Sequence, residues 1–154
     1  NGCTVNLGQI RPHSRGEVLL RNADPTALPI VRPNYFSDTR DLEAVTEGAL
    51  FAMDVMEQSA IRKYISRRHI PDNRVLSKSE VKRFCQTEAH AALHPAGTCK
   101  MGQDEMSVVT PDLKVQGLEA LRVADASVMP RLISGNPNAV CIMIGEKAAD
   151  LIRG

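Results

Sequence analysis

The chain has 154 residues, enough for one ordinary domain with a sizeable apolar core. Its 43% hydrophobic and 24% charged residues exclude intrinsic disorder and predict a soluble globular protein, with the cytoplasm as the expected compartment. A net charge of +1 gives no sign of an electrostatic partner, and the longest purely apolar run, Ala139 to Ile144, is far too short for a membrane span. The chain opens with Asn1 rather than Met and shows no signal peptide, so we expect a fragment or a processed product.

The first third of the chain predicts strands followed by a long helix. Thr4–Ile10 alternates loosely, and Gly16–Asn22 has a short apolar centre between turn residues. The stretch "LPIVRPNYF" contains two prolines, so any strand there is short or lies at a sheet edge. A helix is predicted over 39–57, where apolar residues recur at helical spacing: Leu42, Val45, Ala49, Met53 and Met56.

A basic stretch follows, from Arg62 to Arg83, with eight Lys or Arg residues against two acids. Surfaces that bind nucleic acid usually interleave aromatic residues for stacking, and Tyr64 is the only aromatic residue within this stretch. The stretch therefore predicts a solvated connecting segment, with no nucleic-acid partner.

The segment "SKSE" at Ser77–Glu80 has the pattern of a capping box, in which a hydroxyl and a glutamate satisfy each other's backbone donors. We expect a helix over 78–93, which Pro95 ends because it disfavours helical geometry in the residue before it. This places His94 at the helix end, exposed and well anchored, before a loop that contains glycine.

Three short strands are predicted next, over Val108–Thr110, Leu113–Val115 and Leu121–Asp125. The final segment, "ISGNPNAVCIMIGEKAADLIRG", predicts a helix over about 137–152, with Asn136 as its N-cap and Pro137 at its first position.

The start of that last helix carries a chemical expectation of its own. Its sequence is apolar all round through Ile144, so we expect this part to be buried. A buried helix N-terminus presents unpaired N–H groups and partial positive charge, so an electronegative group is expected in front of it.

Metal binding and hydrolysis find little support in the sequence. His90 and His94 are four residues apart, but Ala91 stands where metalloproteases carry a glutamate, and no third ligand follows at motif spacing. We predict a structural role for His90 and no metal site. The four scattered cysteines form no CxxC pair and predict reduced thiols. There is no G-x-S-x-G elbow and no phosphate-binding glycine loop.

Three ordered motifs carry a family resemblance: "HPAGTCKMG", "VVTPDLKVQGLEALRVADASVMP" and "SGNPNAVCIMIGEKAADLI". Together they resemble the C-terminal region of the glucose-methanol-choline oxidoreductases, and "SRGEVLLRNADPTALPIVRPNYFSDTRDLEAVTEG" resembles the segment before it. The likeness covers nearly the whole chain, and the general similarity is greatest to the choline dehydrogenase-like branch.

The resemblance implies an FAD-dependent enzyme that oxidises a small-molecule alcohol. His94 matches the family's catalytic histidine, and Asn136 matches its second active-site position. Asp125 and Ala126 match the backbone turn near the FAD, and Pro137 and Asn138 match the helix start that faces the flavin ring. The general chemistry agrees, since histidine suits a proton transfer near neutral pH and a hydride needs a cofactor as its acceptor.

Two departures from the family pattern stand out. Thr110 replaces an acid that many members have, and the N-terminal GxGxxG region is missing. The chain thus resembles the C-terminal part of a longer enzyme, whose N-terminal FAD-binding part would be its partner.

The expected fold class is α/β (α+β): an antiparallel sheet with flanking helices, plus a C-terminal strand and helix that complete an FAD-binding domain. We expect a substrate-binding region over 1–117 and a return segment of the FAD-binding domain over 118–154. Two alternatives stay open: a non-catalytic binding or structural module derived from the family, and, ranked last, a metal-dependent enzyme using His90 and His94.

Overall fold

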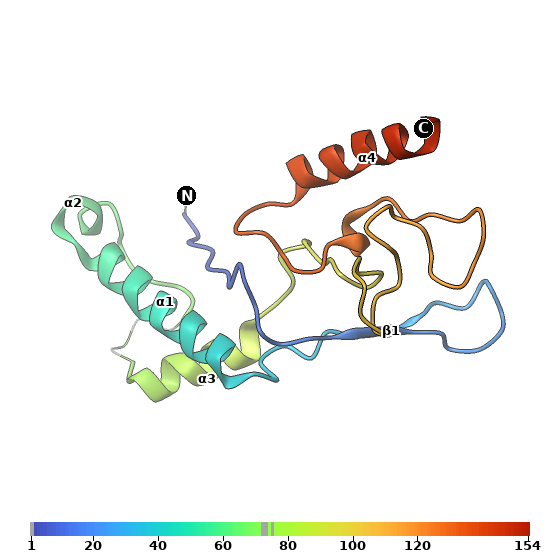
Figure 1. Ribbon diagram of the computed structural model, residues 1–154. Coiled ribbons are helices and arrows are strands. Elements are labelled where there is room, and N and C mark those ends of the chain that lie inside the picture. Colours follow the sequence, from blue (N-terminus) through green and yellow to red (C-terminus); the bar gives the residue numbers. More distant parts are fainter. Residues whose placement is uncertain (1, 72–73, 75) are drawn as a thin grey trace. The chain divides into compact units, whose positions relative to one another are not determined.

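A computed structural model describes residues 2–71, 74 and 76–154 (Figure 1). The chain divides into two compact units, which we describe separately. The helical unit comprises Asn1–Gln9, His13–Gly16 and Pro33–His90. The C-terminal unit comprises Ile10–Pro12, Glu17–Arg32 and Ala91–Gly154.

Helix α1 (Thr39–Glu57) is the longest element of the helical unit and confirms the predicted bounds. Asp38 caps it, because its carboxylate accepts a hydrogen bond of 3.0 Å from the Arg40 N–H. Leu42, Thr46 and Ala49 are buried along one face, as the spacing of the apolar residues predicted. A single turn, α2 (Ser59–Arg62), follows directly.

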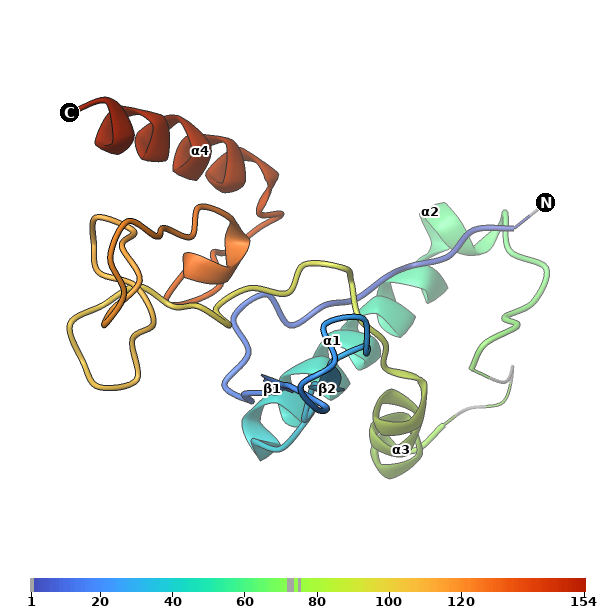
Figure 2. The same cartoon turned by 90° about the vertical axis from the view of Figure 1, so that its right-hand side faces the viewer.

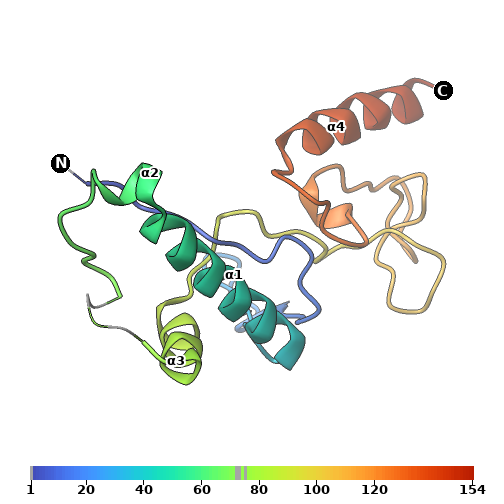
Figure 3. The same cartoon turned by 90° about the vertical axis from the view of Figure 1, so that its left-hand side faces the viewer.

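Helix α3 (Lys78–Glu88) packs against α1 (Figures 1 and 3). The predicted capping box is confirmed: Ser77 Oγ accepts from the Glu80 N–H, and Glu80 accepts from the Ser77 N–H at 2.9 Å. Val81 and Cys85 of α3 close a small core with Leu42 and Ala49. This core is apolar on both helices, so burial rather than charge holds the pair together.

Basic side chains of the predicted connecting stretch lie at the surface of this unit. Several pair with acids of nearby helices: Arg62 with Glu57, Arg74 with Glu80, Lys78 with Glu47, and Lys82 with Glu43. These exposed pairs contribute little to stability, and they agree with a solvated segment.

The predicted C-terminal end of α3 was wrong, because the helix stops at Glu88 rather than at residue 93. Ala89 has extended backbone angles, and Leu93 has a positive φ of 59°. Residues 89–94 are all exposed, so continuing the helix would have buried no apolar surface. Most helical stability in proteins comes from a packed face, which this stretch lacks.

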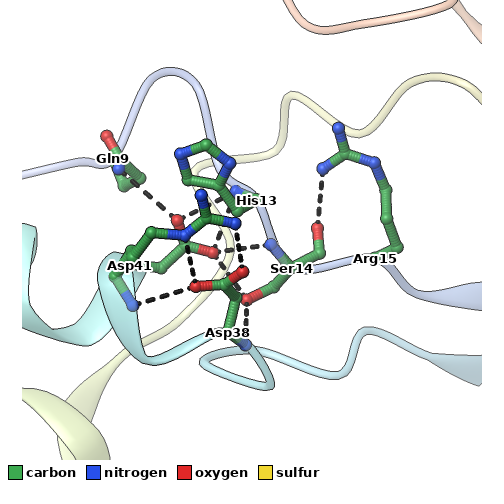
Figure 4. A network of polar contacts seen from close by, with 7 residues as sticks. Gln9, His13, Ser14, Arg15, Asp38 and Asp41 are labelled. Carbon is green, nitrogen blue, oxygen red and sulfur yellow. Dashed lines mark hydrogen bonds and ion pairs between the residues drawn. The ribbon is translucent and has the colours of Figure 1, made fainter.

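A buried carboxylate organises the start of α1 (Figure 4). Asp41 is only 2% exposed, and its oxygens accept from the N–H of His13 at 2.9 Å and of Ser14 at 2.7 Å. They also accept from the Ser14 hydroxyl at 2.5 Å and from the Gln9 amide at 3.5 Å. Asp41 therefore fixes Gln9, His13 and Ser14 within the helical unit, and we call this set of contacts the Asp41 clasp.

The only regular sheet within the described residues is a two-stranded antiparallel ribbon of the C-terminal unit. Strand β1 (Glu17–Leu19) pairs with β2 (Ile30–Arg32), with Val18 opposite Val31. Both strands were predicted, and β2 is short, as Pro29 and Pro33 on either side of it required. Residues 4–10 form no strand, so that prediction was wrong.

The other three predicted strands, between residues 108 and 125, are reduced to isolated bridges. Val109 pairs with Val115 and Lys114 with Arg122, both antiparallel, and Met101 pairs with Val109 in parallel. These stretches turn too sharply for longer ladders: Leu113 and Ala120 have positive φ values, as does Gly117. The fold is therefore a mixture of helices and a small antiparallel sheet, with most of the C-terminal unit in ordered loops.

The core of the C-terminal unit lies beneath the last helix, α4 (Asn138–Arg153). Its buried residues are Val109, Leu113, Val128, Met129, Ile144 and Ala148. A short 3₁₀ helix, η1 (Ala126–Val128), contributes Val128 and lies under the N-terminal half of α4 (Figure 2). At the other end of α4, the Arg122 guanidinium donates to the Leu151 carbonyl at 3.2 Å, which satisfies one of the helix's terminal acceptors.

We expected the first half of α4 to be buried all round, but only one face of it is buried. Ile144 is 4% exposed, whereas Ile142 is 59% and Met143 54% exposed. The helix thus has a packed face and an apolar face that nothing in the described chain covers. No helix in the described part of the chain is both long enough and apolar enough to cross a membrane.

Candidate active site

All six candidate site residues lie in the C-terminal unit. They come from three places: the loop that carries His94, the turn that leads into η1, and the start of α4. His94, Asp125, Asn136 and Asn138 are exposed, Ala126 is half-buried and Pro137 is buried.

His94 lies in an extended loop rather than at a helix end. The loop after Pro95 is fixed by backbone hydrogen bonds to the η1 segment: Gly97 donates to the Ala126 carbonyl at 3.4 Å. Cys99 donates to the Ser127 carbonyl at 2.9 Å. We call residues 94–101 the His94 loop. Its anchor is a strand-like ladder of backbone bonds, not the helix that the sequence predicted.

The ladder continues for one more step, from the Met101 N–H to the Val128 carbonyl at 2.8 Å. Three successive carbonyls of η1 are thus used by three alternate amides of the His94 loop. Backbone amides that bond in this way are costly to leave unpaired, so the two segments hold each other in register.

Gly97 is required where the ladder begins. Its φ is +89°, and a Cβ at this position would lie 3.2 Å from the Met129 carbonyl oxygen. Any other residue would be strained in backbone angle and crowded against main chain that cannot move aside cheaply. The glycine therefore permits the close approach of the His94 loop to η1.

Asp125 shapes the η1 turn from its N-cap position. Its carboxylate accepts from the Ser127 N–H at 2.8 Å and from the Ser127 hydroxyl at 2.5 Å. Both bonds are donated by Ser127, and the carbonyl of Ser127 accepts from the Cys99 N–H. Of the two predicted cofactor residues, Ala126 is therefore bonded directly to the His94 loop, and Asp125 is linked to the loop through Ser127.

The start of α4 differs from the prediction. The helix begins at Asn138, Pro137 occupies the N-cap position with helical angles, and no side chain caps this end. The predicted capping role of Asn136 was wrong, because Pro137 already has helical geometry and its carbonyl accepts the first bond of the helix, from the Cys141 N–H at 2.9 Å. Asn136 is left exposed just before the helix.

Uncapped first-turn amides give this helix end an electropositive character. Its first turn holds no acidic side chain, and the N–H groups of Asn138 and Ala139 donate to no acceptor within the described chain. A helix of this length concentrates partial positive charge at such an end. The arrangement suits an electronegative group outside the helix, as the sequence predicted.

The loop that follows the His94 loop is stabilised by Asp104. Its carboxylate accepts from the Lys100 ammonium at 2.8 Å, the Ser107 hydroxyl at 2.9 Å and the Met106 N–H at 2.9 Å. The hydrogen bond from Lys100 is the main reason why the pKa of Asp104 is lower than usual. Asp104, Ser127 and Gly97 were not predicted from the sequence, although "DAS" and "PAG" are patterns typical of caps and turns.

Thr110 departs from the family pattern and has a local role here. Its hydroxyl accepts from the Lys114 N–H at 3.3 Å, and its backbone closes a tight turn with Leu113 and Lys114.

The two histidines considered as metal ligands do not belong to a ligand cluster. Within the described residues, no group of three His, Cys, Asp or Glu side chains could hold a metal ion. His90 Nδ1 lies 3.2 Å from the Glu88 carbonyl oxygen, next to the end of α3. The four cysteines are free thiols.

The GMC oxidoreductase family model matches residues 12–145, most of the chain. The chain therefore belongs to the GMC oxidoreductase family. This confirms the resemblance that the three sequence motifs carried.

The most similar relatives include oxygen-dependent choline dehydrogenases. That of Klebsiella pneumoniae subsp. pneumoniae is 45% identical over 154 residues, which cover 100% of this chain and 28% of the relative. That of Escherichia coli O139:H28 is 42% identical over the same 154 residues, with the same coverage. The chain thus spans little more than a quarter of the curated relatives it matches.

Solved structures show the same fold. Pyridoxine 4-oxidase from Mesorbium loti matches with a TM-score of 0.84 and 29% identity, over 92% of this chain and 28% of that one. A variant of the Aspergillus oryzae RIB40 formate oxidase, made to probe FAD modification, matches with a TM-score of 0.85 and 35% identity. That match covers 94% of this chain and 26% of the oxidase.

Proposed function

We propose that this chain is the C-terminal part of an FAD-dependent enzyme that oxidises an alcohol, and that it carries the proton-handling side of the site. The observation that carries the proposal is the ladder between the His94 loop and η1, next to the uncapped start of α4. It joins the predicted catalytic segment to the predicted cofactor segment in one rigid part of the C-terminal unit.

The residues present fit a flavin. The uncapped N-terminus of α4 offers free backbone donors and partial positive charge at Asn138, with Pro137 buried behind them. The turn at Asp125 and Ala126 is fixed by the Asp125 carboxylate, which caps it, and the Ala126 carbonyl is bonded to the His94 loop. These four residues would hold the FAD. When bound, FAD supplies the acceptor for the hydride that no side chain can take.

His94 and Asn136 would act on the substrate hydroxyl. Histidine can accept or stabilise a proton near neutral pH, and the ladder fixes the loop that presents it. The Asn136 amide can both donate and accept, so it can orient the same oxygen. Two polar groups from separate elements of one unit can hold an alcohol in reactive geometry. The choline dehydrogenase relatives make choline the first alcohol to test.

The rest of the enzyme would cover the open face of α4. The exposed Ile142 and Met143 belong to the segment 118–154, which we assign to the FAD-binding domain, with 1–117 as the substrate-binding region. An apolar face of this kind is typical of a surface that packs against a further part of the protein. The partner would be the N-terminal, FAD-binding part of the same protein.

The proposal is tested with the full-length protein. It is expected to purify with bound FAD, and the flavin absorption should bleach when choline or another small alcohol is added without oxygen. Oxygen, quinones and other carriers can then be compared as acceptors for reoxidation. A full-length protein with no flavin, or with flavin that no alcohol reduces, would favour the non-catalytic module instead.

Residues 1–154 alone are expected to bind FAD only weakly. Dinucleotide sites rely on a glycine loop and helix to hold the pyrophosphate, and the sequence has no such loop. The measurement is the flavin content of the purified chain after dialysis against buffer. A yellow protein that keeps its flavin would contradict this expectation.

A further inference from the structure

The Ser127 hydroxyl has a place in the C-terminal unit that the proposed chemistry does not use. Ser127 lies in the middle of η1 and is half-buried. Its hydroxyl donates to Asp125 at 2.5 Å, and its own N–H donates to the same carboxylate oxygen at 2.8 Å. Its carbonyl accepts from Cys99 of the His94 loop at 2.9 Å.

These bonds form one continuous connection between Asp125 and the His94 loop. The carboxylate holds both polar groups of Ser127, which fixes where the Ser127 carbonyl points. That carbonyl is the central acceptor of the ladder, between Ala126 and Val128. Hydrogen bonds to an ionised group are stronger than neutral ones, so the connection begins at its strongest bond.

Gly97 makes the ladder sensitive to the shape of η1. A Cβ there would already lie 3.2 Å from Met129 main chain, so the loop approaches η1 closely. A small rotation of the η1 carbonyls would lengthen or bend the bonds from Gly97 and Cys99. His94, three residues before Gly97, would shift with the loop that carries it.

From this geometry we infer that Ser127 is a positioning residue: its hydroxyl bond to Asp125 sets the η1 carbonyls that hold the His94 loop in place. The inference rests on the proposed function, because a shift of His94 would be measured through the rate of the proposed reaction. The partner of the hydroxyl is the Asp125 carboxylate, not the His94 ring. It acts through the main chain of the loop.

Two measurements on the full-length protein test this inference, and the first needs no substrate. Hydrogen exchange of the amides in 97–101 should be about three- to tenfold faster in Ser127→Ala than in the parent protein, the scale of one lost hydrogen bond. Exchange along α4 should not change. The control is Ser66→Ala, an exposed serine of the helical unit, in which both regions should exchange as in the parent.

The second measurement follows steady-state choline oxidation. Ser127→Ala should lower kcat about tenfold with little change in KM, because a displaced loop misplaces the reacting group while the binding surface stays. Ser127→Thr keeps the hydroxyl and should restore most of the rate. Ser127→Cys keeps the shape of the side chain with a weaker donor, and it replaces Ser127→Ala in both measurements if that variant fails to fold. Its decrease in kcat should be smaller than that of Ser127→Ala.

The outcomes separate this inference from the proposed function. Unchanged exchange in 97–101 of both Ser127→Ala and Ser127→Cys overturns the inference, whatever the rate. Faster exchange with normal kcat also overturns it, because the hydroxyl would then serve stability alone. If the parent protein oxidises no alcohol, the proposed function fails, and the kinetic role inferred for Ser127 fails with it. The exchange data would still show whether the hydroxyl holds the loop.

Discussion

Replacing His94 with alanine in the full-length enzyme is expected to slow flavin reduction by about 100-fold or more, the usual scale for a positioned acid–base group. The physical reason is that alcohol oxidation must remove a proton from oxygen as the carbon–hydrogen bond breaks, and alanine offers no acceptor. The measurement is anaerobic stopped-flow reduction by choline, with the FAD content of each variant determined first.

Two further variants place the His94 result in context. Asn136→Ala should cost less than His94→Ala, since its amide orients the substrate and transfers no proton. His90→Ala is a matched control, because this exposed histidine is four residues away and its Nδ1 lies 3.2 Å from the Glu88 carbonyl oxygen at the end of α3. Near-normal reduction by His94→Ala with FAD still bound would rule out the assigned role.

The second large effect is expected at the Asp41 clasp. Asp41→Ala should lower the free energy of opening around His13 and Ser14 by about 3 kcal/mol, because their three donors to the carboxylate lose their acceptor, at about 1 kcal/mol each. The donors are the His13 N–H and the N–H and hydroxyl of Ser14. Amide exchange of His13 and Ser14 should then accelerate about 100-fold. Asp54→Asn, an exposed acid on the same helix, should leave these amides unchanged within about 0.5 kcal/mol.

The clasp should also depend on pH in a defined direction. Burial alone would raise the pKa of Asp41, but hydrogen bonds from His13, Ser14 and Gln9 outweigh it and hold the pKa below its usual value. A lowered pKa gives stability that is complete above the unfolded value of about 3.9 and is lost as the pH falls through the lower folded value. Protection of the His13 and Ser14 amides that stayed constant far below that pH, or that failed already near neutrality, would contradict this account.

Local signals predicted the helices well where a packed face supported them. The capping box at Ser77 and the apolar spacing from Leu42 gave the start of α3 and both ends of α1. The end of α3 was missed because stopping at Glu88 depends on what the next residues could bury. The three strands predicted after residue 107 were wrong, because the positive φ values at Leu113 and Ala120 that break them are not encoded by any typical turn residue.

Sequence motifs identified the residues of the candidate site, but they did not predict how these residues are arranged. The sequence pointed to His94 and Asp125 separately, but the hydrogen bonds that join their segments run between main-chain atoms 29 residues apart, from Gly97 to Ala126. No residue pattern specifies such a pairing. Whether His94 and Asn136 meet at one substrate oxygen stays a prediction, because no hydrogen bond joins them in the described chain.

The ladder beside His94 also bears on how the family can diversify. Its donors are the main-chain N–H groups of residues 97, 99 and 101, so on the loop side only Gly97 is restricted in residue type. Neighbouring positions such as the exposed Thr98 can therefore change during evolution without losing the register of the loop. A scaffold of this kind lets the exposed side chains around His94 vary while the main chain of the loop keeps its place.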